Sequence, residues 1–270
     1  MALAREPQPR GLSAMIKAIT VDCWGTLFLD GPLSDERYTR QRLAGIEAIL
    51  VRSGVKVSRQ DLHRAYDMSG RRLANIWADE RDVPVSGYVT MLLEALDRKL
   101  LQHLEPATIN EMVEAYSMPA LRVPPAVDPG AAAACERLVA NGIVLGVVSN
   151  TMRTPGVVLR RILEATGLLG LFKVLVFSDE CGIRKPHPEI FHRALHQVGA
   201  SPVEALHVGD DAVLDVEGAR QAGMSVIQVA PAGRATGPVK PDAVITALGQ
   251  LPDALERLRP MTRNTQGAGG

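Results

Sequence analysis

The second half of the chain alternates strand-like and helix-like segments, and this alternation restricts the fold more than any other feature. Four apolar runs have the length and composition of buried strands: residues 143–148, 174–177, 205–208 and 225–229. Helical patterns lie between these runs, near residues 155–166, 188–198 and 212–222. Alternating strands and helices build a parallel sheet that is covered by helices on both faces. The sequence therefore predicts an α/β fold with a Rossmann-like, three-layer core.

Residues 34–117 contain only helical periods. Apolar residues recur at helical spacing in four segments, at 43–50, 62–76, 89–100 and 109–116. Ser58 and Asp61 have the spacing of a helix cap before the second segment, and Thr108 is a candidate start for the fourth. Four amphipathic helices with no strand between them predict a small helical bundle.

A first strand near residues 17–22 is separated from the other strands by this helical segment. The simplest topology has an α/β core, residues 15–30 and 120–258, with a helical cap, residues 31–119, inserted after the first strand. Residues 1–14 and 259–270 are predicted to be disordered, because they are rich in Pro, Arg and Gly and carry no apolar period.

Composition excludes several classes of function. Thirty basic residues balance thirty acidic ones and only 4% of residues are aromatic, so neither a nucleic-acid partner nor a membrane partner is expected. Cys23, Cys135 and Cys181 form no Cys-x-x-Cys pair, and such a sparse set fits the reducing cytoplasm. We therefore expect a cytoplasmic protein with a small-molecule substrate, and the sequence leaves monomer and homodimer equally open.

Polar residues gather where four of the predicted strands end. These stretches are residues 22–27, Ser149-Asn150, Lys185-Pro186, and Gly209-Asp210-Asp211 with Asp215. Because the carboxyl ends of parallel strands meet at one rim of a sheet, these side chains are expected to converge there.

The chemistry of these residue types is that of a phosphate site. A carboxylate can act as a nucleophile and divide one difficult step into two. A lysine and hydroxyl groups can hold the oxygens of the transferring group and neutralise its charge. Several carboxylates in one crevice repel one another unless a cation lies between them, and oxygen ligands without His or Cys favour Mg²⁺ over zinc.

In order and position the four stretches resemble the signatures of the haloacid dehalogenase (HAD) superfamily of hydrolases. The resemblance runs from about residue 16 to residue 250. Asp22-Cys23-Trp24-Gly25-Thr26-Leu27 is similar to the nucleophile loop of that family, usually Asp-x-Asp-Gly-Thr-Leu, and residues 184–191 and 207–210 are similar to its later motifs.

The resemblance implies roles on the substrate side of the site. Asp22 is expected to be the nucleophile, and Lys185 is expected to bind phosphate and orient Asp22. The residues expected to contact the substrate or its phosphate are Trp24, Gly25, Thr26, Ser149, Asn150 and Lys185.

The resemblance also implies Mg²⁺ as the cofactor. Asp22 and Asp210 would be ligands, with Asp215 in support, directly or through water. The backbone carbonyl of Trp24 would be a further ligand, because that contact does not use the side chain. Asp211 stands where the family often has Ser, but it remains a candidate ligand.

Trp24 stands where the family has its acid–base Asp. An indole N–H cannot protonate a leaving group near neutral pH, and general acid–base help is worth about 10²–10⁴ in rate. Three solutions remain open: a substrate with a good leaving group, a proton donor from the helical segment, or little activity. The candidate donors are His63, Glu80, Asp82 and His103. Trp24 itself would contact the substrate or only pack beneath the cap.

With Trp24 in place of the acid–base Asp, three functions remain open. The retained carboxylates favour a Mg²⁺-dependent phosphatase that acts on a small phosphorylated metabolite through an aspartyl-phosphate on Asp22, since clustered charges are costly to bury without a cation. The alternative enzyme is a metal-free 2-haloacid dehalogenase that forms an ester on Asp22, because enzymes of that type lack the acid Asp and often carry an aromatic residue there. The non-enzymatic alternative is an impaired hydrolase that binds a phosphorylated ligand or a partner protein.

Overall fold

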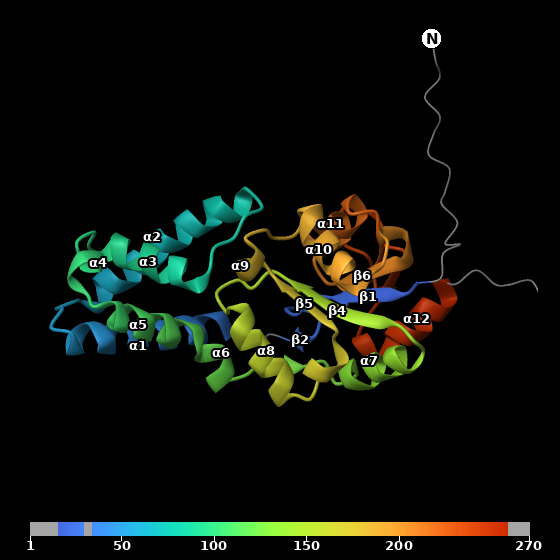
Figure 1. The fold of residues 1–270 in the computed structure, drawn as a ribbon, viewed down its shortest axis with the longest axis horizontal. Helices are drawn as coiled ribbons and strands as arrows, with labels where there is room; N and C mark the ends of the chain where they lie inside the picture. The colour runs from blue at the N-terminus through green and yellow to red at the C-terminus, as the bar shows by residue number, and fades with distance from the viewer. Residues whose placement is uncertain (1–15, 30–33, 259–270) are drawn as a thin grey trace, which may run out of the picture.

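A computed structural model of the chain describes residues 16–29 and 34–258. Its centre is a sheet of six parallel strands in the order β5-β4-β1-β6-β7-β8 (Figure 1). The strands are β1 (Ala18–Val21), β4 (Val144–Ser149), β5 (Val174–Phe177), β6 (Ala205–Gly209), β7 (Ser225–Val229) and β8 (Ala243–Ile245). The predicted α/β fold with a parallel sheet is confirmed, and β8 adds one strand to those predicted.

Helices cover both faces of the sheet (Figure 1). One face carries α10 (Pro188–Val198), the π-helical turn η3 (Ala212–Glu217) and α11 (Gly218–Gln221). The other face carries α7 (Ala131–Ala140), α8 (Gly156–Ala165) and α12 (Leu251–Leu258). The remaining short turns are α9 (Ser178–Cys181), η1 (Leu169–Leu171), η2 (Pro202–Glu204) and η4 (Leu248–Gln250). Because both faces are covered, Val147 packs into one apolar layer and Val148 into the other.

The register of β1 sets the position of the loops that follow the central strands. Val21 pairs with Val147 of β4 on one side and with Val208 of β6 on the other. Asp22, Ser149 and Asp210 lie one or two residues beyond these pairs. They therefore leave the sheet at one rim, where the strands have their carboxyl ends.

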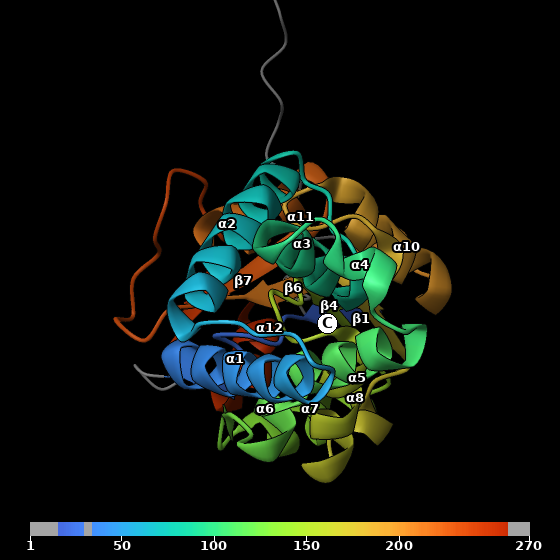
Figure 2. The ribbon, with the colours of Figure 1, turned by 90° about the vertical axis from the view of Figure 1, so that its left-hand side faces the viewer.

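Five of the six described helices between β2 (Phe28–Leu29) and β3 (Ala126–Val127) lie apart from the sheet, and we call them the helical block (on the left in Figure 1, in front in Figure 2). They are α1 (Ser34–Arg52), α2 (Arg59–Ala78), α3 (Val85–Leu96), α4 (Leu100–His103) and α5 (Pro106–Ser117). Ile46, Leu73, Leu92 and Met112 are fully buried in its own apolar cluster, and such burial is worth about 1.5–3 kcal/mol per side chain. The chain returns to the sheet through α6 (Pro119–Arg122) and β3, which pairs antiparallel with β2.

Two helix boundaries in the block differ from the sequence-based prediction. The predicted helix at 89–100 is broken at Asp97, whose backbone is extended (φ −157°, ψ 122°), so α3 and α4 are separate. The helix α5 begins at Pro106 instead of Thr108, because proline suits the first turn of a helix. The predicted cap of α2 is present, with Ser58 Oγ accepting a hydrogen bond from Asp61 N at 3.1 Å.

Two predictions concern the ends of the chain and its membrane association. The predicted disorder at residues 1–14 and 259–270 lies outside the described residues. Within residues 16–29 and 34–258, no helix has the length and apolar character needed to cross a membrane.

Candidate active site

The loop after β1 is a tight turn that leads into β2. Asp22 N donates to Val208 O (2.9 Å), and Gly25 N donates to Phe28 O (2.8 Å). Gly25 has a φ of 73°, and a Cβ at this position would lie 2.3 Å from Asp210 Oδ2. Only glycine fits here, because other residues would suffer both backbone strain and a collision. The turn therefore fixes Asp22 and lets the carboxylate of Asp210 approach its backbone.

Lys185 bridges two carboxylates inside the protein. Its Nζ lies 2.8 Å from Asp22 Oδ1 and 2.5 Å from Asp215 Oδ1, and its side chain is 1% exposed. Asn150 holds the backbone of Lys185 on both sides, accepting from Lys185 N (2.9 Å) and donating to Lys185 O (3.0 Å). The peptide bond between Lys185 and Pro186 is cis. The other three predicted stretches therefore all contact Lys185, through Asp22, Asn150 and Asp215.

Protein groups contact both oxygens of Asp215. Besides Lys185, its Oδ1 lies 3.0 Å from His207 Nε2, and its Oδ2 accepts from Asp211 N at 2.9 Å. His207 Nδ1 lies 2.8 Å from Thr20 Oγ1. Neutral His207 with its proton on Nε2 can therefore donate to Asp215 and accept from Thr20. These contacts allow Asp215 to orient Lys185. Because protein groups already contact both of its oxygens, Asp215 would support a metal through a water molecule.

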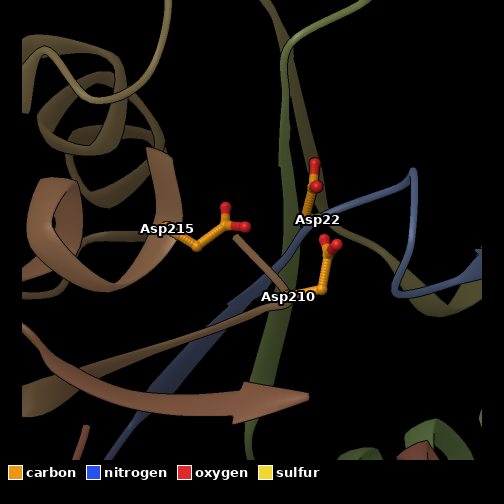
Figure 3. A group of neighbouring side chains, drawn as sticks. All are labelled: Asp22, Asp210 and Asp215. Atoms are coloured by element: carbon orange, nitrogen blue, oxygen red, sulfur yellow. The ribbon is translucent and has the colours of Figure 1, made fainter. Parts of the chain in front are cut away.

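Three carboxylates converge at the rim of the sheet (Figure 3). Ligand atoms of Asp22, Asp210 and Asp215 lie within 4.8 Å of one another. Thr26 Oγ1 contacts Asp210 Oδ1 at 3.4 Å, and Gln228 Nε2 donates to Asp210 O at 3.0 Å. Because Asp215 is engaged by protein donors, Asp22 and Asp210 are the two side chains of this cluster that best fit a hard cation such as Mg²⁺.

Among the predicted carboxylate ligands, Asp211 is the one whose side chain does not join this cluster. Its Oδ1 accepts from Val213 N and Leu214 N, both at 2.8 Å, so its side chain caps the helix that follows. That helix was predicted as one segment at 212–222, but it starts as the π-helical turn η3 and becomes α-helical only at Gly218.

Three carboxylates, those of Asp22, Asp210 and Asp215, lie in the site, whereas Lys185 supplies a single positive charge. Burial, opposed by Lys185 and reinforced by Asp215 and Asp210, raises the pKa of Asp22 to about 6. Burial and then Asp215 raise the pKa of Asp210 to about 6. Burial also acts to raise the pKa of Asp215, but Lys185 and His207 outweigh it and hold that pKa below its usual value. The repulsion is therefore concentrated on Asp22 and Asp210, where a second cation would relieve it.

Two hydroxyl groups complete the predicted phosphate-binding set. Thr26 follows Asp22 in the same loop, and Ser149 ends β4 beside Asn150. Both side chains are fully buried. Hydroxyls placed beside a nucleophile and a lysine can donate to the oxygens of a transferring phosphoryl group.

Residues 16–223 match the family model of haloacid dehalogenase-like hydrolases. The chain belongs to this family. It is 30% identical over 249 residues to a phosphoserine phosphatase from Thermus thermophilus, and the matched region covers 84% of this chain and 93% of that protein. It is also similar to the solved structure of a 2-haloacid dehalogenase from Pseudomonas syringae pv. tomato, with a TM-score of 0.70, 26% identity, and coverage of 91% of this chain and 100% of that one. A HAD phosphatase from Thermococcus onnurineus matches with a TM-score of 0.57, 25% identity, and coverage of 88% and 97%.

Trp24 of this HAD hydrolase is half-buried beside the nucleophile. Its ring packs edge-on against Phe28, with centroids 5.9 Å apart and an interplanar angle of 64°. Its indole Nε1 is buried but has no hydrogen-bond partner. The ring therefore packs against β2, and the N–H has no partner within the described residues.

Sequence reasoning missed the polar residues on the first turns of α1. Arg42 is 1% exposed, and it donates to Tyr116 O (3.1 Å) and to Arg153 O (3.0 Å) on the loop after β4. Within the described residues, the buried side-chain atoms without a hydrogen-bond partner come from the nucleophile loop or this part of α1: Trp24 Nε1, Arg37 Nε, Gln41 Oε1, Arg42 Nη1, and Asp22 Oδ1, whose contact with Lys185 is ionic. The signal in the sequence was an arginine one turn before the buried Ile46, on the apolar face of the helix.

The candidate proton donors of the helical block have other surroundings. His63 and His103 are exposed, and His103 Nδ1 contacts Lys99 O at 2.7 Å. Asp82 is buried, but its carboxylate is engaged by donors that include Tyr88 and Arg184. The described contacts of His63, His103 and Asp82 do not connect them with Asp22, and Glu80 lies half-buried with a φ of 55°.

Proposed function

We propose that this HAD hydrolase is a Mg²⁺-dependent phosphatase that acts on a small phosphorylated metabolite through an aspartyl-phosphate on Asp22. The observation that carries the proposal is the convergence of Asp22 and Asp210, whose ligand atoms lie within 4.8 Å of each other. Burial raises the pKa of both carboxyl groups, to about 6, which is the effect that a cation between them would reverse. A divalent cation held by Asp22, Asp210 and the carbonyl of Trp24 would balance their charge and that of the phosphate. A metal-free reaction gives no reason to keep both carboxylates at the nucleophile.

The residues around Asp22 suit a two-step reaction. A carboxylate oxygen of Asp22 attacks phosphorus, and the bond from phosphorus to the leaving oxygen breaks. Water then attacks the phosphorus of the aspartyl-phosphate, which releases inorganic phosphate and restores the carboxylate. Lys185, Ser149 and Thr26 hold the phosphoryl oxygens during both steps.

Asp215 maintains the charge of Lys185 in this scheme. Burial alone would lower the pKa of Lys185, but Asp215 and Asp22 outweigh burial and raise that pKa above its usual value. Lys185 therefore stays protonated throughout the pH range of the enzyme, and it can neutralise charge without acting as an acid.

The absence of an acid at Trp24 limits the leaving group. An alkoxide is a poor leaving group without a proton, whereas an acyl or aryl oxygen leaves as a stable anion. We therefore propose a substrate with an activated phosphate. We also propose that the helical block is the cap, which closes over the substrate and excludes water.

One assay tests the proposed function. Purified protein is offered p-nitrophenyl phosphate with Mg²⁺ or with EDTA, and phosphate release is measured for the wild type, Asp22→Asn and Asp253→Asn. We expect release that needs Mg²⁺, that is lost in Asp22→Asn, and that persists in Asp253→Asn, an exposed residue paired with Arg137. Phosphate release that survives in Asp22→Asn would overturn the mechanism.

A specific observation supports a second candidate, a 2-haloacid dehalogenase. The buried N–H of Trp24 has no partner, and it could donate to a departing halide, which needs no proton. The same protein is therefore offered 2-chloropropionate, and chloride release is measured with and without EDTA. Chelator-resistant chloride release without phosphatase activity would favour this candidate. Stabilisation by inorganic phosphate without turnover of either compound would instead indicate a binding protein.

A further inference from the structure

The carboxylate of Asp82 makes contacts with both the helical block and the core. Asp82 lies in the loop between α2 and α3 and is 5% exposed. Its Oδ1 accepts from groups of the helical block: Trp77 Nε1 (3.1 Å), Val83 N (2.9 Å) and Tyr88 OH (2.6 Å). Its Oδ2 accepts from groups of the core: Ser178 Oγ (2.6 Å) and Arg184 Nη1 (3.2 Å). Each oxygen therefore serves one side of the interface.

The backbones beside Asp82 and Arg184 are paired as well. Asp82 N donates to Gly182 O (3.1 Å), and Arg184 N donates to Glu80 O (3.0 Å). Arg81 and Ile183 form an antiparallel bridge between these two bonds. Residues 80–82 of the helical block and 182–184 of the core thus form a short antiparallel ladder.

This ladder ends next to the lysine of the active site. Arg184 directly precedes Lys185, and its guanidinium lies 4.3 Å from the ring centroid of Trp77. The side chain of Arg184 is 5% exposed, so nearly all of it is enclosed between Trp77 and Asp82. Movement of Arg184 therefore cannot be separated from movement of the peptide that carries Lys185.

A second route leads from Asp82 to the loop after β4. Ser178 Oγ, which donates to Asp82, accepts from Thr151 N at 3.0 Å. Thr151 follows Ser149-Asn150, and Asn150 clamps the backbone of Lys185. The carboxylate of Asp82 thus contacts groups next to two of the three loops that hold the phosphate-binding side chains, those of Ser149 and Lys185.

We propose that Asp82 is a positioning residue that couples docking of the helical block to the placement of Lys185. When the block separates from the core, Asp82 Oδ2 is withdrawn and Arg184 loses its buried counter-ion. Arg184 also loses the cover of Trp77, so its guanidinium becomes exposed to water and the contacts that fix residues 182–185 against the block are broken. This segment then relaxes until the block docks again. Lys185 is held in its catalytic position only while the block covers the site. The catalytic consequence rests on the proposed function, whereas the structural coupling does not.

Hydrogen exchange tests the coupling without any need for turnover. Exchange of peptides covering residues 182–187 is compared in the wild type, Asp82→Asn and Tyr88→Phe. Asp82→Asn keeps the size of the side chain but removes the charge that holds Arg184. Tyr88→Phe is the matched control, because it removes a bond of the same length (2.6 Å) as that from Ser178, but from the oxygen that faces the helical block.

We expect exchange at residues 182–185 to become at least about tenfold faster in Asp82→Asn and to stay unchanged in Tyr88→Phe, while peptides of α7 and β7 keep the wild-type rate. Equal acceleration in both variants, acceleration spread evenly over the molecule, or no acceleration would overturn the proposal. An inactive wild-type protein would count against the proposed function and leave this comparison intact.

Kinetic measurements distinguish a positioning role of Asp82 from an effect on the stability of the protein alone. The double variant Asp82→Asn/Arg184→Met removes both charges, so its unfolding free energy should recover most of what Asp82→Asn loses. We expect kcat for p-nitrophenyl phosphate to fall about tenfold or more in Asp82→Asn and to stay low in the double variant. Recovery of kcat together with stability would mean that Asp82 acts through stability alone, and the positioning role would be wrong.

Discussion

The ammonium group of Lys185 lies 2.5 Å from Asp215, and neither side chain is more than 1% exposed. Asp22 lies slightly farther from the same nitrogen, at 2.8 Å, and it keeps a raised pKa of about 6. Asp215 therefore takes the larger part of the lysine charge. Asp22, the proposed nucleophile, is left with a partial counter-ion, which is the condition in which a second cation would lower its charge repulsion most.

Replacing Asp215 should lower the free energy of unfolding of the protein. Asp215→Asn leaves Lys185 buried with one partner fewer, and breaking a buried ion pair costs about 3–5 kcal/mol of stability. Urea unfolding measures this loss. The control is Asp253→Asn, which breaks an exposed ion pair with Arg137 and should change stability little. Similar stabilities for the two variants would contradict the assigned importance of the buried pair.

Gly25→Ala should be destabilising and should reduce activity. The left-handed backbone costs an alanine about 1–2 kcal/mol, and the added Cβ would lie 2.3 Å from the carboxylate of Asp210. Gly170→Ala is the matched control, since a Cβ there meets nothing within 4 Å. We expect thermal unfolding to show a lower midpoint for Gly25→Ala alone. A variant with wild-type stability and activity would show that neither property depends on the close approach of Asp210 to the backbone of Gly25.

Two substitutions of Trp24 separate its ring from its N–H. Trp24→Phe keeps an aromatic ring against Phe28 but loses the donor, and loss of one hydrogen bond to substrate should lower kcat/KM about tenfold. Trp24→Asp restores an acid, so hydrolysis of an alkyl phosphate should rise by about 10² or more. Steady-state kinetics with p-nitrophenyl phosphate and a simple alkyl phosphate measure both effects. If Trp24→Asp gives no gain, leaving-group protonation is not what limits the enzyme.

Asp179 should make stability fall as pH rises from about 4 to 6. Burial, opposed by the N–H of Gly156 and reinforced by Glu180 and Asp82, raises the pKa of Asp179 to about 6. In that window the folded protein binds more protons than the unfolded chain, so the unfolding free energy decreases with increasing pH. Asp179→Asn should remove about 1–3 kcal/mol of this decrease.

Urea unfolding at several pH values tests the prediction for Asp179. The control is Asp67→Asn, at an exposed position of α2, which should leave the slope unchanged. Asp22 and Asp210 contribute slopes of the same sign, so the wild-type decrease should be larger than the share removed by Asp179→Asn. A slope that Asp179→Asn leaves intact would contradict the raised pKa.

The sequence predicted which residues meet at the rim of the candidate active site, because each of them follows a strand of the parallel sheet. Asp22, Asn150 and Lys185 each follow a recognisable apolar strand, and a parallel sheet brings such positions together whatever their distance along the chain. The same reasoning could not tell Asp211 from Asp210. Their difference arises from the π-helical turn η3, where Asp211 becomes a cap, and no period in the sequence marks that turn.

The contacts between the helical block and the core were beyond sequence reasoning. Asp82 was named only as a candidate donor, although its partners Ser178 and Arg184 lie 96 and 102 residues away. Arg42 was hidden inside an apolar helical stripe, and its partner Arg153 lies 111 residues away. Helical periodicity gives the buried face of each helix, but it does not give the angle at which that face meets another domain.

The mass of the peptic peptide that contains Asp22 tests the central claim most directly. It is taken from enzyme quenched with acid during turnover of p-nitrophenyl phosphate and Mg²⁺, and the sample is kept in acid during digestion because an aspartyl-phosphate hydrolyses at higher pH. The account predicts a fraction of this peptide that carries one added phosphoryl group on Asp22, and no such fraction with EDTA. Steady phosphate release while the peptide stays unmodified, or an alkyl ester on Asp22 formed only from 2-chloropropionate, would contradict it.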